Sequence, residues 1–220
     1  MSDSKGAVLT RNIVKATLGV MLGLQVIDDP AAATVALDPV RSRLLAELAE
    51  PASAATLAGR VGLARQKVNY HLRTLEAHGL VRVASKRRWG GLTERLMVAT
   101  AASYVVSPGA MGPVAADPGR ENDRLSASYL IALAARVIRE MGTFLRLARE
   151  TGKRLPTLSI DTEVRFRSAA DRAAFAQELT DAVTKLVSRY HDAAVAGGRA
   201  HRLVALAYPK PLKSQAEERS

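Results

Sequence analysis

Between residues 38 and 79, apolar side chains recur every three or four positions in three successive segments, which is the spacing of amphipathic helices. Asp38 followed by Pro39 favours a helix start, because the carboxylate can accept hydrogen bonds from free N–H groups and proline needs no N–H there. Gly79 suits the left-handed position beyond the last segment. The pattern predicts three helices: from Pro39 up to Pro51, after Ser53 up to Gly62, and over about 64–77.

After residue 79 the pattern changes to that of strands. Leu80–Val83 begins one predicted strand and Glu94–Val98 forms a returning one, with a basic, glycine-containing loop at Lys86–Gly91 between them. Two helices joined by a short turn with a glycine and followed by a β-hairpin make a winged helix-turn-helix. We therefore expect this fold at residues 37–106.

The second half of the chain predicts a different arrangement. Glycine and proline cluster at 107–119, which predicts a linker. Beyond it, the periodicity indicates a long helix, a half-buried strand, a second helix and a last strand, at 120–152, 158–167, 171–190 and 203–208. The predicted fold class is α+β, with an N-terminal winged helix-turn-helix followed by a long helix and a small α/β unit over 120–208. Residues 1–36 are expected to form an N-terminal arm or helix, and 209–220 a flexible tail.

The long predicted helix carries an apolar stripe that is too broad for one neighbour to cover. We therefore expect a homodimer built on this helix, with Leu133, Val137 and Met141 in the interface. The alternative is that the α/β unit covers the stripe within one subunit and that the N-terminal arm forms the dimer.

The net charge of +11 favours an anionic partner. Residues 37–100 carry eleven basic and five acidic side chains, so more than half of the surplus falls on the predicted winged helix. Nucleic acid is the usual partner of such a surface, and a membrane surface is a less common one. A generally basic protein without such a partner is the remaining alternative.

The outer face of the third predicted helix has side chains that suit a DNA major groove. If Val68, Leu72 and Leu75 face the core, the opposite face is polar. Arginine can contact guanine at two points, and asparagine or glutamine can do the same with adenine. Lysine suits a phosphate, and tyrosine can reach a phosphate or a thymine methyl group. The candidate DNA-binding residues on this helix are Arg65, Gln66, Lys67, Asn69, Tyr70 and Arg73.

Lys86, Arg87 and Arg88 are three adjacent cations in the predicted loop of the hairpin. They repel one another unless an anion lies near, and the backbone or minor groove of DNA would supply one. We therefore count them among the candidate DNA-binding residues. The alternative for the polar face of the helix is a solvated surface. A winged helix that binds protein in place of DNA would need an exposed apolar patch on the helix.

The run from Leu63 to Val81 resembles the recognition helix and wing entry of ArsR-type bacterial transcription regulators. Its matches to their pattern are Val68, His71, Leu72, Leu75, Gly79, Leu80 and Val81. The resemblance covers about residues 37–100 and departs at Ala64, where the family usually has a capping serine. It implies a cytoplasmic, homodimeric regulator, expected to be a repressor, that reads an inverted repeat in double-stranded DNA. The C-terminal half is where a small-molecule effector would bind, if there is one.

Other classes of function lack their characteristic residues. The chain has no cysteine, which excludes thiolate metal sites, catalytic cysteine and disulfides. His191, Asp192 and His201 do not show the spacing of the family's metal sensors, so we expect no metal and no cofactor. No phosphate-binding loop, nucleophile elbow or triad order is present, so we expect no catalytic residues and no enzyme. No apolar run reaches the roughly twenty residues of a spanning helix, and we expect no membrane partner.

Overall fold

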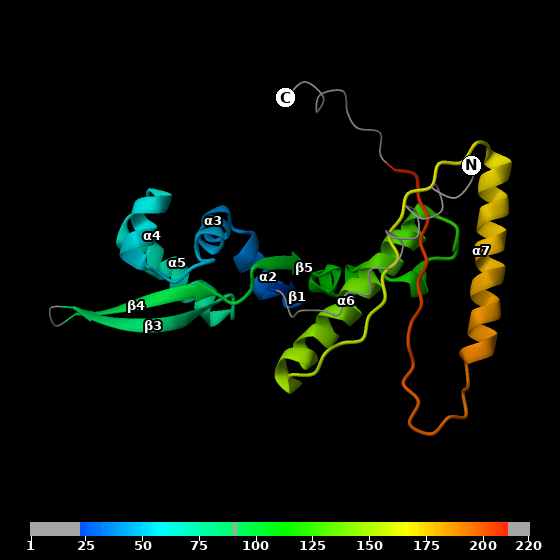
Figure 1. The fold of residues 1–220 in the computed structure, drawn as a ribbon. Coiled ribbons are helices and arrows are strands. Elements are labelled where there is room, and N and C mark those ends of the chain that lie inside the picture. The colour runs from blue at the N-terminus through cyan, green and yellow to red at the C-terminus, as the bar shows by residue number, and fades with distance from the viewer. Residues whose placement is uncertain (1–22, 90–91, 211–220) are drawn as a thin grey trace, which may run out of the picture. The chain divides into compact units, whose positions relative to one another are not determined.

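The structure, a computed structural model, describes residues 23–89 and 92–210. They divide between two compact units, one within Ala16–Ser159 and the other within Ile160–Ser220. Figure 1 shows the elements of both. Each unit is described by itself below.

A winged helix-turn-helix occupies the centre of the first unit, as predicted. Its elements are α3 (Pro39–Glu47), β2 (Ala52–Ser53), α4 (Ala54–Val61), α5 (Arg65–Ala77), β3 (Val81–Trp89) and β4 (Leu92–Ala99). The antiparallel sheet has the order β2-β4-β3. The β3–β4 hairpin extends beyond the helices and forms the wing (Figure 1).

Local hydrogen bonds fix where the helices begin. The Asp38 carboxylate accepts hydrogen bonds from the backbone N–H groups of Val40 and Arg41, each at 3.0 Å, and so caps α3. Ser53 caps α4 in the same way. α5 follows Ala64 and has no side-chain cap, which is the consequence expected of an alanine at that position.

The helices and the hairpin close around one apolar core. Its fully buried side chains come from α3, α4, α5, the first residue of β3 and the turns between them: Leu44, Leu48, Leu57, Val68, Leu75, Leu80 and Val81. Because α5 contributes to this core along its length, its rotation about its own axis is fixed, and so is the face that it turns outward.

Two further elements lie in the segment predicted as an N-terminal arm or helix. β1 (Leu24–Ile27) pairs in parallel with β5 (Ser103–Val106), and α2 (Pro30–Leu37) packs on α3 and α5. Ile27 and Val35 are buried in the same core as the winged helix. From β1 onward this segment is therefore part of its own subunit's core. Residues 1–22 of the predicted arm lie outside the described residues.

The segment predicted as a linker forms two 3-10 helices, η1 (Pro108–Val114) and η2 (Pro118–Arg120), that pack on α6 (Ala127–Thr151). Arginines satisfy its free carbonyl groups, since Arg139 donates to the carbonyl oxygen of Ala116 at 2.9 Å and Arg120 to that of Pro113 at 2.8 Å. These bonds hold a glycine- and proline-rich segment in place. The long helix begins at Ala127 and not at 120, because Ser126 caps it.

The second unit contains α7 (Ala169–Tyr190), which confirms the predicted second helix. The two predicted strands beside it were wrong: within 158–167 only Ser159 forms an isolated bridge, and 203–208 is not a strand. Alternation alone does not make a strand, because the backbone also needs a partner for its hydrogen bonds. A side-chain ion pair at 2.7 Å joins Glu163 of the first segment to Lys210, two residues beyond the second. None of the described residues of this unit is buried.

Candidate nucleic-acid interface

The outer face of α5 presents all six side chains that the sequence singled out. Arg65, Gln66, Lys67, Asn69, Tyr70 and Arg73 are exposed, and Tyr70 retains 65% of its accessible surface. Val68, Leu72 and Leu75 are buried on the other side, as expected. The amphipathic division of the helix is therefore complete, and the polar side chains are free to reach a surface outside the domain.

The turn before α5 holds this face at a defined angle. Gly62, at φ 69°, takes the left-handed conformation that ends α4. Arg43 of α3 donates a hydrogen bond to the carbonyl oxygen of Val61 at 3.3 Å, and Arg60 lies 3.4 Å from the carboxylate of Glu47. Both contacts tie α4, the first helix of the helix-turn-helix, to α3.

The three wing cations lie on a strand, which corrects the prediction of a loop. β3 continues to Trp89, and Lys86, Arg87 and Arg88 are all exposed on it. Successive side chains of a strand point to opposite faces of the sheet. The three cations therefore cannot all face the same surface.

A β-bulge at Ala84 decides which face each cation takes. Val83 is paired with Met97 and Ser85 with Leu96, so Ala84 is an extra residue with no partner. Met97 is buried and Val83 packs against the core, which identifies their face as the core side of the hairpin. The extra residue exchanges the faces of all the β3 residues that follow it.

Lys86 and Arg88 consequently lie on the core side of the wing, and Arg87 lies on the other side. The opposed pairs beyond the bulge are Lys86 with Arg95, Arg87 with Glu94, and Arg88 with Thr93. Opposed residues share a face, so the core side carries three cations, two from β3 and Arg95 from β4.

Arg95 was not among the predicted site residues. Its guanidinium forms an ion pair and a hydrogen bond with the carboxylate of Glu76, near the end of α5. This contact shows independently that the core side of the wing is turned toward the recognition helix. No periodicity in the sequence could reveal a pair of residues nineteen positions apart on different elements.

His71 lies on the inner side of α5, near the start of α3. Its ring meets the ring of Tyr70 edge to face, with centroids 5.5 Å apart, and its Nδ1 is buried without a hydrogen-bond partner among the described residues. The backbone hydrogen bond from Arg41 lowers the pKa of Asp38, and the charges of Arg41 and His71 act in the same direction. The cap of α3 and the middle of α5 are thus electrostatically linked.

The three predicted interface residues lie on the side of α6 opposite its contact with β1. Ala132, Ala135 and Gly142 form a buried stripe of small residues, and a Cβ atom on Gly142 would come within 2.8 Å of Val26. At 3.6 residues per turn, the opposite side carries Leu133, Val137 and Met141, which are half-buried, and Ala148, which is buried. On the same side, Phe144 and Leu147 remain 45% and 52% exposed.

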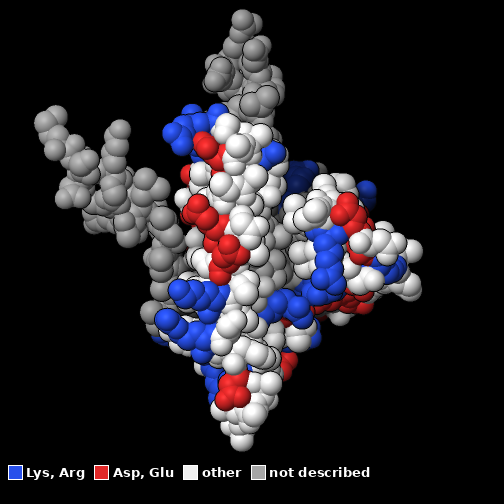
Figure 2. Space-filling view, turned by 90° about the vertical axis from the view of Figure 1, so that its right-hand side faces the viewer, with Lys and Arg blue, Asp and Glu red and all other residues white. Residues whose placement is uncertain are grey.

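The charges of α7 differ from those of the winged helix. It carries three residues of each sign: Asp171, Arg172, Glu178, Asp181, Lys185 and Arg189. On the face that Figure 2 presents, acidic and basic side chains are interspersed with uncharged surface. α7 is therefore no basic counterpart of α5.

Within the described ranges, no three histidine, aspartate or glutamate side chains come together as a metal site would require. Among the helices of the same residues, none has both the length and the hydropathy needed to cross a membrane.

A family model of a helix-turn-helix domain matches residues 36–84. The match spans α3, α4, α5 and the first part of β3, which are the elements that position the outer face of α5. No curated protein matches the chain. The matched domain is of a DNA-binding, regulatory kind, and it supports a DNA-binding regulator of transcription.

Proposed function

We propose that the chain is a sequence-specific, ArsR-like repressor that binds double-stranded DNA as a cytoplasmic homodimer at an inverted repeat. The observation that carries the proposal is the outer face of α5, where six exposed polar side chains lie opposite a fully buried apolar stripe. The helix-turn-helix match over residues 36–84 supports it.

In this proposal α5 lies in the major groove, with the side chains of its first half nearest the base edges. Arg65, Gln66 and Asn69 can form two-point contacts with bases, whereas Lys67 and Arg73 suit phosphates. A protein-binding face would need an apolar patch, and the ring of Tyr70 is the one large apolar group that the described α5 exposes.

The dimer is proposed to form through the side of α6 opposite its contact with β1. A single winged helix reads too few base pairs to be selective, and a two-fold pair places two recognition helices about 34 Å apart, which is one turn of DNA. Leu133, Val137 and Met141 lie opposite the stripe of α6 that packs on β1, so they face away from β1. This supports their place in the interface.

The second unit also supports a dimer formed by the C-terminal half of the chain. None of the described residues of this unit is buried, so its apolar side chains are open to another surface. The exposed apolar residues of α7 are Phe175, Leu179, Leu186, Val187 and Tyr190. We propose that this unit takes part in the dimer together with α6.

DNA binding is tested by selecting duplexes from a random pool and measuring the affinity of the selected sequence by fluorescence anisotropy. The triple change of Lys86, Arg87 and Arg88 to alanine should weaken binding to all sequences and reduce its salt dependence. A control that removes three exposed cations outside the winged helix, Arg124, Lys153 and Arg154, should change both much less. Failure to enrich any sequence, with a folded protein, would favour a protein-binding winged helix.

The dimer is tested by sedimentation of a double variant, Leu133→Glu with Val137→Glu. It should yield folded monomers, because two buried, unpaired carboxylates cannot be accommodated in an apolar interface. The matched control is Thr143→Glu with Arg146→Glu, on exposed positions of the same helix. A folded dimer that survives the first double change would move the interface away from α6.

A further inference from the structure

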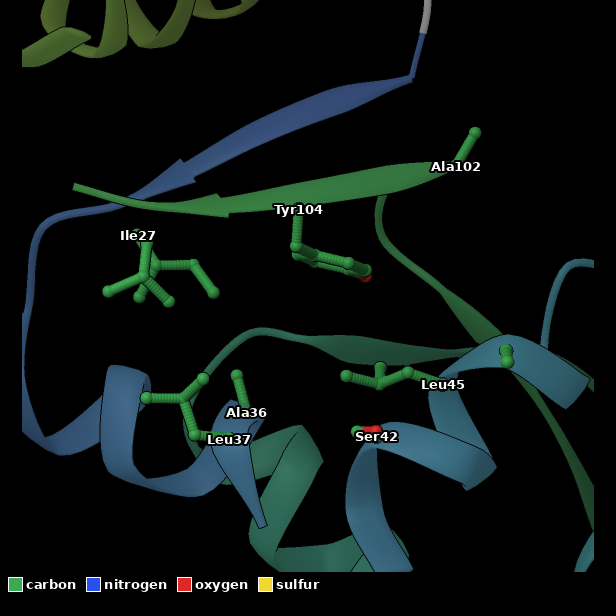
Figure 3. Close-up of a pocket in the computed structure, with 9 residues that line it drawn as sticks. Ile27, Ala36, Leu37, Ser42, Leu45, Ala102 and Tyr104 are labelled. Carbon is green, nitrogen blue, oxygen red and sulfur yellow. The ribbon is translucent and has the colours of Figure 1, made fainter. Parts of the chain in front are cut away.

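We propose that an apolar pocket between the winged helix and the parallel sheet binds a small uncharged organic molecule. The pocket has a volume of about 320 Å³ and lies between strands β1 and β5 on one side and helices α2 and α3 on the other. Figure 3 shows Ile27 and Tyr104 extending from the sheet toward Leu37 and Leu45 of the helices across the hollow.

The chemistry of the walls selects an uncharged ligand. Among the described residues that line the pocket, none carries a charge, and the only side-chain polar groups are the hydroxyls of Ser42 and Tyr104. The Tyr104 hydroxyl is already engaged, since it donates to the carbonyl oxygen of Leu80 at 2.8 Å and accepts from the N–H groups of Thr100 and Ala101 at 3.1 and 3.2 Å. A charged ligand would lose its hydration there without a partner in return.

The same walls are a poor site for water. The pocket is open to solvent, so the waters in it are continuous with bulk water, and its apolar side chains offer them no hydrogen bonds. An apolar molecule that displaces them gains free energy. The volume also falls in the range of about 300–1,000 Å³ that small-molecule sites occupy.

The size favours a small molecule over a protein segment. The pocket is an open hollow of about 320 Å³ between two layers of structure, and both layers contribute apolar side chains to it. Leu37 at its rim is 67% exposed and can fold over a bound molecule. The inference goes beyond the proposed function, because the pocket lies apart from α5 and the wing and its occupancy can be measured without DNA.

The test uses the full chain and N-phenyl-1-naphthylamine, an uncharged fluorophore that brightens in apolar sites. Fluorescence should rise to saturation at one molecule per chain. Ala46→Trp places a large ring at an exposed position of α3 that lines the pocket, and it should weaken binding by about tenfold or more. Ala31→Trp is the matched control, also at an exposed helix position, on α2, that does not line the pocket, and its affinity should stay within about twofold of wild type.

A second measurement locates the probe in the wild-type chain, whatever the stability of the variants. Methyl NMR shifts on adding N-phenyl-1-naphthylamine should concentrate on Ile27, Leu37 and Leu45. Equal affinity in all three proteins, absence of saturable binding, or shifts concentrated on Leu133 and Leu147 of α6 would each overturn the proposal. Loss of DNA binding by any of these proteins would bear on the proposed function alone.

Discussion

Neutralising Lys86 and Arg88 should weaken DNA binding more than neutralising Arg87. The three residues are adjacent, equally basic and all exposed, and they differ in the face of the wing on which they lie. Lys86 and Arg88 share the core-side face with Arg95, whose ion pair with Glu76 turns that face toward α5. If α5 lies in the major groove, this is the face that the flanking backbone approaches.

The expected size follows from counterion release. Each phosphate contact contributes about 0.9 to the slope of log affinity against log salt, so Lys86→Gln with Arg88→Gln should reduce the slope by about 1.8. Over a rise in salt from about 50 mM to about 200 mM, wild type should therefore lose about tenfold more affinity than this double variant. Arg87→Gln should change the slope by less than about 0.3, because Arg87 lies on the opposite face, across from Glu94.

The measurement is fluorescence anisotropy of a labelled duplex of arbitrary sequence, since phosphate contacts do not depend on the bases. Circular dichroism should show that all variants keep the wild-type fold. If Arg87→Gln reduces the slope as much as Lys86→Gln or Arg88→Gln does, the assignment of faces from the bulge is wrong. If none of the three reduces it, the wing does not contact DNA.

Four further outcomes are expected. Gln66→Ala or Asn69→Ala should cost about 1–3 kcal/mol on the preferred duplex and relax one or two base positions in a selection experiment, and an unchanged base preference would mean that these side chains touch only phosphate. Ala64→Ser should raise the free energy of unfolding in urea by about 1 kcal/mol, because α5 lacks a side-chain cap. Gly142→Ala should lower the free energy of unfolding by about 1–3 kcal/mol, because the added methyl group would contact Val26. Gly59→Ala should raise the free energy of unfolding by about 1 kcal/mol, because the space around its Cβ position is open. The pKa of Asp38 is lower in the folded chain than its ordinary value. The stability that results is fully present above the ordinary pKa and is lost as the pH falls through the lowered pKa. Asp38→Asn should therefore make the decline of the melting temperature in acid less steep.

The winged helix could be predicted from the sequence because its signals are local. The Asp38 and Ser53 caps, the glycine in the turn and the three apolar stripes each act within a few residues, and the structure keeps all of them. The polar face of α5 followed from the same periodicity. Its exposure required only that the opposite stripe be buried, and that stripe is buried.

Elements that depend on a distant partner escaped prediction. β1 exists because β5 supplies its hydrogen bonds from far along the chain, and four residues of mostly apolar sequence show no such dependence. The opposite error occurred at 158–167, where alternation predicted a strand and the described structure has only the isolated bridge at Ser159. The segment at 107–119 has the composition of a linker, yet arginines from η2 and α6 hold its carbonyl groups in place.

The sequence could not predict which face of the wing each cation takes, because the faces depend on how the two strands pair. A strand has a period of two, so a single unpaired residue exchanges the faces of every residue beyond it. Without the bulge at Ala84, Arg87 would share the core side with Val83. One cation of β3 would then be turned toward α5, whereas the structure has two there. Nothing about an alanine marks it as a bulge, because the position depends on the register with Met97 and Leu96 of the other strand. The count of basic residues in the wing is therefore a local property, whereas the number that can act together on one DNA backbone depends on the pairing of two strands.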